Sequence, residues 1–502
     1  MRRVILCGAI LAFSSLAHAE WREATTDSYM IYSEGSRDAL LRFAERVEQF
    51  DQVLRLMTGI HTPPSPIKLR IYLVGGQSVV RELYSTDKPV AGFYHVSPQG
   101  GIAVASYDNG WGTFAPTTES VLYHEYCHHF MYQYASASYP VWYSEGFAEY
   151  FASTRFNRDG SVDIGRLDMA RLPDLMRGSW LPADKVLHDG LGDLPTSSWS
   201  QFYGEAWLLT HYLFADSQRE HEFRQFLLLR VRGVPNDEAL QQTFAPDARA
   251  LDRALHHYLD GEHLMARRII KPDLKSPSVA VRELPAAEGE LLLPALRAEL
   301  GVPDAQRSKL LATIRNRAAR FPQDSYVRTT LAVAEARLGD AAKAQQMLQL
   351  LVEEDASNRR ALLQSAWLKI HSDSSDKDAR RAAEREARTL AVKANRLMND
   401  DPEALLLFYL SFQHEPGGPS QNAVDGLERA YEVLPQRQQT ALLLAHELVR
   451  AKRVDDAIRV LRPVAFSPHG AQAQQAENAR RWIRQLEASQ SELQHTPAQQ
   501  GP

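Results

Sequence analysis

Hydrophobic positions in the first half of the chain follow both helical and strand-like spacing. Between residues 38 and 57 apolar side chains recur every three or four positions, which predicts an amphipathic helix. Residues 67–74 alternate and are rich in β-forming residues, and residues 101–106 form a second short apolar run, so both are predicted strands. A further helix is predicted for residues 118–134. The mixture indicates an α+β domain over residues 20–265.

The second half, residues 288–490, has no strand pattern and is rich in Ala, Leu, Arg, Gln and Glu. Pro402, Pro435 and Pro468 lie 33 residues apart. A small residue precedes each break in the pattern by 11 or 12 positions, at Ala344, Ala391, Ala423 and Ala457. This spacing resembles tetratricopeptide (TPR) repeats, in which a small residue in the second helix of a pair lets the helices approach. An irregular helical bundle is the alternative.

Three further segments are distinguished by composition. Residues 266–287 contain three prolines and are predicted to be a linker between the two halves. The polar run of residues 371–376 is predicted to be an insertion between repeats, because the unit around it is too long. The polar tail, residues 491–502, is predicted to be disordered.

The amino terminus has the pattern of a signal peptide. Arg2 and Arg3 precede an apolar stretch over residues 4–16, and Ala17-His18-Ala19 is a small-residue cleavage site. The apolar run is too short to span a bilayer, so we expect cleavage after Ala19 rather than a membrane anchor. The protein is therefore predicted to be periplasmic or secreted, with residues 1–19 removed.

Charge and cysteine content narrow the choice of function. The 502-residue chain carries 57 Lys and Arg against 62 Asp and Glu, and this near balance argues against a nucleic-acid-binding protein. Its 44% hydrophobic content excludes wholesale disorder. Cys7 lies in the predicted signal and leaves Cys127 as one thiol, so the mature chain has no internal disulfide.

A metal-binding motif lies inside the helix predicted for residues 118–134. The run His124-Glu125-Tyr126-Cys127-His128 matches the pattern H-E-x-x-H. Two histidines four positions apart differ by about 40° around a helix, so both imidazoles can bind one cation. Glu125 leans toward the side where a metal-bound water would lie and can accept its proton. The motif predicts a hydrolytic metal site.

A second motif follows in residues 141–150. Catalytic zinc needs three protein ligands and an open position for water, and two His with one Glu is a known ligand set. Glu145, on a following antiparallel helix, is the predicted third ligand. Glu149, one helical turn further on, is predicted to accept the ring N–H of a ligating histidine. The predicted cofactor is one Zn²⁺ per chain.

Together the two motifs resemble those of the gluzincin metallopeptidases, which include thermolysin-like enzymes and zinc aminopeptidases. The second motif reads W-x-x-E-G-x-A, and the similarity covers residues 90–215 well and residues 29–80 loosely. It implies an α+β thermolysin/gluzincin-like zinc peptidase domain followed by the all-α TPR-like domain. In that family His124, His128 and Glu145 would bind zinc and Glu125 would be the general base.

The resemblance also assigns a role to Tyr203, at the start of an apolar helical stretch. A tyrosine at this place in the aminopeptidases donates its hydroxyl to the developing oxyanion. The alternative is a tyrosine that only packs at the start of a helix. His211, eight residues on, is a poorer candidate and is interpreted as a core histidine.

The sequence departs from the aminopeptidases in one respect. Their Gly-x-Met-Glu-Asn motif, which binds the free amine of the substrate, is not found before His124. Residues 101–106 occupy the position of the strand beside the cleft but offer no acidic anchor, which favours an endopeptidase. Cys127 is interpreted as a buried small residue, and His129 as a residue that packs or faces solvent.

The function predicted from these observations is hydrolysis of peptide bonds by a zinc-activated water, with the helical repeats recruiting a substrate or protein partner. Two alternatives stay open. The first is a catalytically inactive peptidase-like fold that serves as a TPR scaffold or binding protein in the cell envelope. The second is a zinc hydrolase that acts on a non-peptide amide or ester.

Overall fold

A computed structural model describes residues 20–495 of the chain, apart from several short segments. Those segments are residues 88–89, 108–115, 135–138, 168, 170, 177–179, 189–192, 262–263, 373 and 466–472. The predicted signal peptide, residues 1–19, therefore lies outside the described residues. In the described part of the chain, no helix combines the length and the apolar character that crossing a membrane requires.

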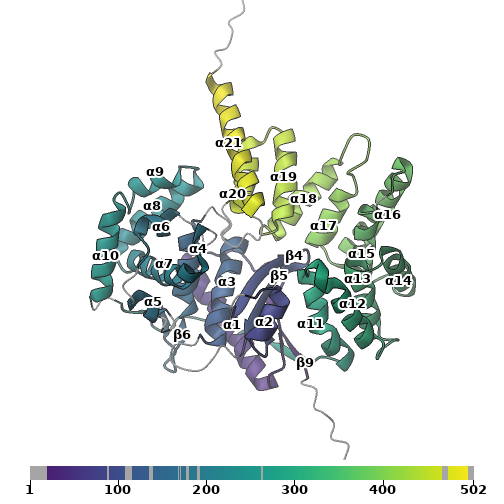
Figure 1. The fold of residues 1–502 in the computed structure, drawn as a ribbon, viewed down its shortest axis with the longest axis horizontal. Coiled ribbons are helices and arrows are strands. Elements are labelled where there is room, and N and C mark those ends of the chain that lie inside the picture. Colours follow the sequence, from purple (N-terminus) through teal and green to yellow (C-terminus); the bar gives the residue numbers. More distant parts are fainter. Residues whose placement is uncertain are drawn as a thin grey trace, which may run out of the picture.

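A six-stranded mixed sheet forms the centre of the N-terminal half (Figure 1). Its strands are arranged in the order β4-β5-β3-β2-β1-β9, in which β2, β3 and β5 run parallel and the outer pairs are antiparallel. The strands are β1 (Arg22–Thr25), β2 (Tyr29–Ser33), β3 (Leu69–Val74), β4 (Gly92–Ser97), β5 (Gly100–Ser106) and β9 (Ala280–Glu283). Strand β4, which the sequence analysis did not predict, is one edge.

Helices cover both faces of this sheet because the strands are apolar on both sides. Helices α1 (Arg37–Thr58) and α3 (Thr118–Tyr134) pack on one face in the largest hydrophobic core. Helices α2 (Gln77–Tyr84) and α11 (Ala286–Leu300) pack on the other. The helix predicted over residues 118–134 is confirmed with the same bounds.

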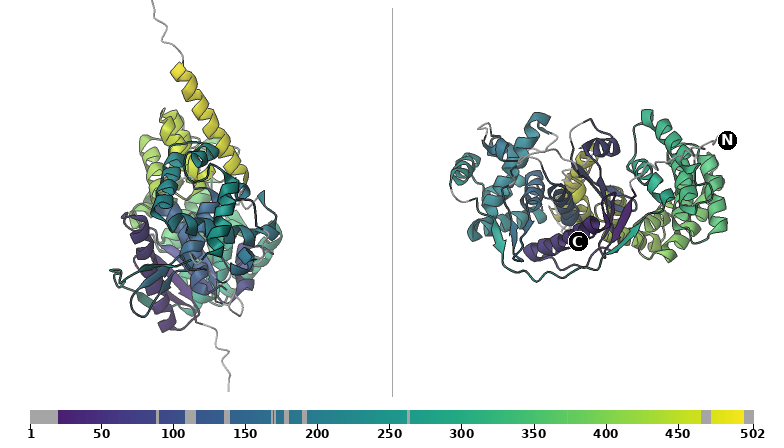
Figure 2. Two further views of the ribbon diagram at one scale, coloured as in Figure 1. Left: turned by 90° about the vertical axis from the view of Figure 1, so that its left-hand side faces the viewer. Right: turned by 90° about the horizontal axis from the view of Figure 1, so that it is seen from below.

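The remaining helices of the N-terminal half gather beyond α3, on the side opposite the first repeats (Figure 2), and α8 contacts the last repeats, where Arg462 donates a hydrogen bond to the Val231 carbonyl. Among them α4 and α7 pack closely against each other, and α4 also packs against α3. Their bounds are α4 (Val141–Ala152), α5 (Leu172–Met176), α6 (Ala183–His188), α7 (Trp199–Phe214), α8 (Ser217–Val231), α9 (Asn236–Gln241) and α10 (Ala248–Asp260). A small sheet joins β6 (Arg155–Phe156), β7 (Val162–Ile164) and β8 (Arg267–Ile269).

The second half is an array of antiparallel helix pairs, as the repeat pattern predicted. Each pair packs on the next, and α11, α13, α15 and α17 form a continuous inner row. After α11 the helices are α12 (Asp304–Ala318), α13 (Ser325–Leu338), α14 (Ala341–Glu354), α15 (Arg359–Ile370), α16 (Lys377–Leu397), α17 (Pro402–Leu410), α18 (Gln421–Val433), α19 (Gln438–Arg450), α20 (Val454–Ala465) and α21 (Ala473–His495). The four alanines of the repeat pattern lie on the second helices α14, α16, α18 and α20 and are fully buried.

The structure differs from the sequence predictions at both ends of the array. Residues 266–287 are not only a linker: β8 joins the small sheet and β9 extends the large one, with Arg282 paired to Glu23. The proline-rich composition obscured these short strands, which form through pairing with distant segments. The predicted tail, residues 491–502, is helical up to His495, because its polar residues are compatible with a helix.

A half-buried ion pair joins the array to the sheet. Arg70 on β3 donates two hydrogen bonds to the Glu299 carboxylate on α11, at 2.9 and 2.6 Å. Burial alone would raise the pKa of Glu299, but the charge and hydrogen bonds of Arg70 outweigh it and lower the pKa to about 2. The pair therefore stabilises the contact between α11 and the sheet at every pH at which the Glu299 carboxylate is ionised.

The Glu299→Gln variant tests this contact. A carboxyl group whose pKa falls from about 4.5 to about 2 on folding contributes roughly 3 kcal/mol above pH 4.5, and this contribution disappears as the pH falls toward 2. We expect the variant to unfold at lower urea concentration than the unmodified protein at pH 7, and the difference to shrink steadily between pH 4.5 and 2.5. A difference that does not change with pH would contradict this account.

Gly146 sets the distance between α4 and α7. A Cβ atom at this position would lie 2.2 Å from the Thr210 hydroxyl and 2.3 Å from the Ala206 carbonyl oxygen. We therefore expect Gly146→Ala to destabilise the protein by about 1–3 kcal/mol through overpacking, measured as a lower thermal midpoint. The control is Gly426→Ala on α18, where the nearest atom is 3.6 Å away and the helix should gain about 0.5–1 kcal/mol. Equal midpoints for the two variants would contradict the prediction.

Candidate metal centre

Helices α3 and α4 bring the two sequence motifs together. Helix α3 is buried along most of its length, and α4 is buried almost completely between α3 and α7. Pro140 precedes the first residue of α4 and fixes where that helix begins. Gly146, the neighbour of Glu145, lets α7 approach closely. The packing therefore holds the Glu145 side chain against α3.

The three predicted ligands converge. The Nε2 atoms of His124 and His128 lie 3.2 Å apart. Glu145 Oε2 lies 3.4 Å from the former and 3.5 Å from the latter. Within the described residues, these three form the one group of His, Cys, Asp or Glu side chains that could hold a metal ion. His128 and Glu145 are fully buried, and 15% of the His124 side chain is exposed.

This triangle fits zinc. Ligand atoms bound at 2.0–2.1 Å in a tetrahedron are about 3.3–3.4 Å apart, close to the three separations between these ligand atoms. Two imidazole nitrogens and one carboxylate oxygen are also a donor set that zinc accepts, and three protein ligands leave a fourth position open. The residues that could hold a metal are therefore His124, His128 and Glu145, as predicted.

Each histidine has a second partner that orients its ring. His124 Nδ1 lies 3.2 Å from Glu149 Oε1, the contact predicted for Glu149. His128 Nδ1 lies 3.4 Å from the Ser144 hydroxyl, which is 3.2 Å from the hydroxyl of Tyr132. When Nδ1 donates to these oxygens, Nε2 of both rings carries the lone pair that a metal requires.

Arg171 holds Glu149 in place. Its Nε and a terminal nitrogen donate to the two carboxylate oxygens at 3.0 and 2.6 Å. Burial would raise the pKa of Glu149, but the charge of Arg171 and the hydrogen bond from His124 outweigh it and lower the pKa to about 2. Glu149 is therefore ionised at neutral pH and accepts the His124 N–H as a carboxylate.

The two ligand histidines differ in proton affinity. Burial lowers the pKa of His128. Burial also opposes protonation of His124, but its hydrogen bonds to Glu145 and Glu149 outweigh burial and raise its pKa to about 10. A cation is thus favoured where the carboxylates of Glu145 and Glu149 meet, and a metal ion would replace the proton on His124.

Glu125 lies between the metal centre and the edge of the sheet. Its side chain is half-buried. Gly92 of β4 is its neighbour in the sheet: a Cβ atom there would lie 3.5 Å from Glu125 Cγ, an ordinary contact, and would clash instead with Val121 on α3. Glu125 follows His124 directly on α3, and its negative charge is among the causes that raise the pKa of His124. These features are those of a base that serves the open position.

Tyr203, at the start of α7, faces the same centre. Its ring centroid is 6.0 Å from that of His124, and the Arg171 guanidinium lies 4.9 Å above the tyrosine ring. Burial, and after it the negative charge of Glu145, raise the pKa of Tyr203 well above its ordinary value. The hydroxyl therefore keeps its proton and is a donor at neutral pH.

Sequence reasoning missed Arg171, Ser144 and Tyr132. Arg171 precedes the short helix α5, outside both motifs, and no spacing marks it. Ser144 lies in the second motif beside Glu145, so its adjacency to a ligand was the available signal. The contacts of these three residues with the metal centre are visible only in the three-dimensional structure.

Other residues singled out from the sequence lie away from the metal centre. Cys127 is fully buried and burial raises the pKa of its thiol, so the interpretation as a small packing residue is confirmed. His129 is buried and its Nδ1 lies 3.1 Å from the Tyr94 hydroxyl, so it packs rather than facing solvent. His211 is a core histidine whose Nδ1 lies 2.7 Å from the Tyr258 hydroxyl.

Comparisons with known proteins give few relatives. Residues 119–235 match a family described as "Protein of unknown function (DUF1570)". Among curated protein sequences, none matches this chain. A solved TPR protein of Thermus thermophilus is 16% identical and covers 40% of this chain and 100% of its own, with a TM-score of 0.33. Yeast Tom70 is 14% identical, covers 64% of this chain and 70% of its own, and has a TM-score of 0.31.

A third match is MamA (residues 41 to the end) from Desulfovibrio magneticus RS-1, 15% identical, which covers 41% of this chain and 96% of its own with a TM-score of 0.26. The resemblance to gluzincin metallopeptidases was therefore wrong as an assignment. The segment that carries both motifs matches a family whose description gives no function, not a peptidase family. A thermolysin-like fold of the N-terminal half is likewise not shown. The helical repeats of the second half are shown by the structure.

The Glu149→Gln variant tests the role of the second contact to His124. An amide cannot accept the ring N–H as a carboxylate does, so we expect zinc affinity to fall about 10–100-fold in competition with a chelator. Glu205→Gln on α7 is the matched control, since burial raises the pKa of Glu205 to about 7 and an amide resembles its protonated form. Unchanged zinc affinity in Glu149→Gln would contradict the assignment.

Proposed function

We propose that this protein is a zinc-dependent hydrolase whose substrate is a polypeptide. One observation carries the proposal: two imidazole nitrogens and one carboxylate oxygen from α3 and α4 lie 3.2–3.5 Å from one another, and Glu125 follows His124 directly on α3. Such a triangle with an adjacent carboxylate suits hydrolysis better than a structural metal site, because structural zinc has four protein ligands. The proposal rests on this geometry and on no family membership.

The residues of the chain would divide the chemistry among them. His124, His128 and Glu145 would hold the ion, which when bound supplies the Lewis acidity that lets water ionise near neutral pH. Glu125 would accept a proton from the attacking water and return it to the leaving amine. The protonated hydroxyl of Tyr203 would donate to the oxygen that gains negative charge. Arg171 would act through Glu149 and the Tyr203 ring as a positioning residue.

The helical array supports a polypeptide as the substrate class. Repeats of paired helices form extended surfaces suited to protein chains. Here a cavity of about 570 Å³ lies between the inner helices and the sheet, large enough to take several side chains. A small amide or ester would need no such surface. The proposed division of labour is recruitment by the repeats and cleavage at α3.

The second candidate is a binding protein without catalysis, whose repeats do all the work. The large cavity beside the inner helices favours it, because that surface does not depend on the metal centre. In this case the zinc ligands would stabilise the contact of α3 with α4 and nothing more. The two candidate functions predict different results when the carboxylate of Glu125 is removed.

The Glu125→Gln variant distinguishes the hydrolase from the binding protein. In the hydrolase, this variant should bind one zinc per chain as tightly as the unmodified protein and lose hydrolysis by at least about a thousandfold, because the water has lost its base. The measurement is zinc content together with cleavage of unfolded casein, with and without a chelator. Glu145→Ala should lose both zinc and cleavage.

Two outcomes would count against the hydrolase. Zinc at one per chain with no cleavage of casein or of mixed peptides by the unmodified protein would favour the binding protein. Full activity in Glu125→Gln would remove the proposed base and with it the mechanism. Tyr203→Phe supplies a graded check, with an expected loss of about 10²–10³ in kcat and little change in KM.

A further inference from the structure

Two adjoining cavities separate the inner row of the helical array from the sheet. The larger measures about 570 Å³ and the smaller about 190 Å³, and both are lined by Glu299, Arg337, Gln364 and Glu403. The walls come from β2, β3 and the turn between β4 and β5 on one side, and from α11, α13, α15, α17 and the start of α19 on the other. We call the two cavities, which adjoin at these four shared residues, the inner groove.

Cationic side chains outnumber anionic ones in the inner groove. The cationic residues that line it are Lys68, Arg70, Arg337, Arg359, Arg360 and Arg437, against two glutamates. Two of the six are neutralised, Arg70 by Glu299 and Arg359 by Asp401. The other four have no carboxylate partner among the described residues.

The contacts of those four cations are to uncharged groups. Lys68 Nζ donates to the Thr26 carbonyl at 2.6 Å, and Arg360 donates to the Thr330 hydroxyl at 2.9 Å. Arg437 donates to the Gln439 side chain at 3.1 Å, and its other terminal nitrogen is buried without a partner in the described part of the chain. The Arg337 guanidinium has no hydrogen bond or ion pair with any described residue.

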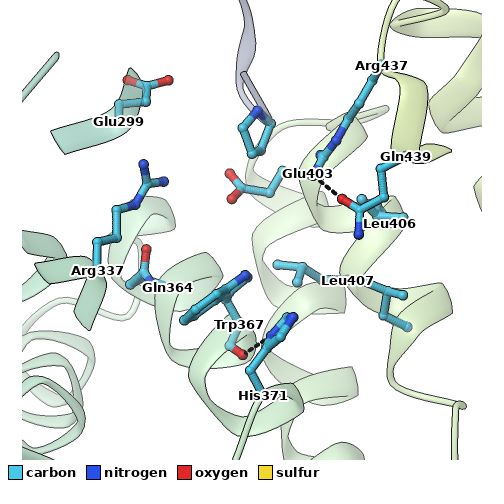
Figure 3. A pocket seen from close by; sticks show the side chains of 12 residues that line it. Glu299, Arg337, Gln364, Trp367, His371, Glu403, Leu406, Leu407, Arg437 and Gln439 are labelled. Carbon is cyan, nitrogen blue, oxygen red and sulfur yellow. Dashed lines mark hydrogen bonds between the residues drawn. The ribbon is translucent and has the colours of Figure 1, made fainter. Parts of the chain in front are cut away.

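Glu403 lies near two of these arginines without a direct contact to either. In Figure 3 its carboxylate lies between Arg337 and Arg437, and neither forms an ion pair with it. It accepts a hydrogen bond from Gln99 at 2.7 Å instead. Burial, and after it the charge of Asp401, raise the pKa of Glu403, whereas the hydrogen bond from Gln99 and the charges of Arg337 and Arg437 lower it. The inner groove thus keeps a surplus of positive charge in a partly dehydrated space.

We propose that the inner groove binds an acidic polypeptide segment in an extended conformation, with carboxylates on Arg337 and Arg437. An extended chain suits the length of the space along four inner helices, and half-buried guanidinium groups bind carboxylates strongly. Nucleic acid is less suited, because the whole chain carries a net charge of −5. The proposal names the partner class for the recruitment function proposed above and does not depend on hydrolysis.

Peptide binding to the Glu125→Gln protein, which should not cleave its ligand, tests this proposal. The probes are fluorescent peptides of alternating Glu and Ser, the same peptide with Gln for Glu, and a single-stranded oligonucleotide, compared by anisotropy. We expect the Glu peptide to bind at least about tenfold more tightly than the Gln peptide and the oligonucleotide, and added salt to weaken the Glu peptide more than the uncharged Gln peptide. Equal binding of both peptides, or tighter binding of the oligonucleotide, would overturn the proposal.

Variants locate the site. Arg337→Gln and Arg437→Gln should each weaken the Glu peptide by about 10–100-fold, whereas Arg396→Gln, the same charge change on the exposed face of α16, should change it less than about twofold. If all three variants weakened binding of the Glu peptide equally, the peptide would not bind in the inner groove. Affinity for the Glu peptide should persist after zinc is removed, so loss of catalysis and loss of binding are separate results.

Discussion

The convergence of three ligand atoms from two antiparallel helices is the constraint on which the N-terminal half depends. His124 and His128 meet because they are one turn apart on α3, but Glu145 reaches them only because α4 is packed against that helix. The close approach of α7 at Gly146 keeps α4 in position. The packing of three helices thereby fixes distances of 3.2–3.5 Å between polar atoms.

Burial of so much charge in one place is costly without compensation. Glu145 and Glu149 are both at most 2% exposed, and moving a carboxylate out of water costs several kcal/mol. Arg171 compensates one of them with two hydrogen bonds. A divalent cation bound by Glu145 and the two histidines would compensate the other. A bound divalent cation would thus both stabilise the buried carboxylate and supply the chemistry of the proposed function.

The sequence was sufficient to predict the elements with strong local patterns. Helix α3, the meeting of its two histidines and the buried alanines of the repeats all follow from spacing along the chain. Arg171 could not be found this way, because it lies outside any periodic element and acts through a contact 22 residues away. Strand β9 was missed for a related reason: it is short and forms by pairing with β1, far away along the chain, so its composition alone is weak evidence. Strand β4 forms a hairpin with its neighbour β5, and it was missed because polar residues interrupt its apolar pattern. Family resemblance read from two short motifs proved misleading, although the residues in those motifs do converge.

The central claim is that His124, His128 and Glu145 bind one zinc ion. Anomalous X-ray diffraction at the zinc edge, on crystals grown with one equivalent of zinc, tests it most directly. We predict a single strong peak about 2.0–2.1 Å from the two Nε2 atoms and one carboxylate oxygen. A peak at any other group of residues, or none at these three in zinc-loaded crystals, would contradict the claim.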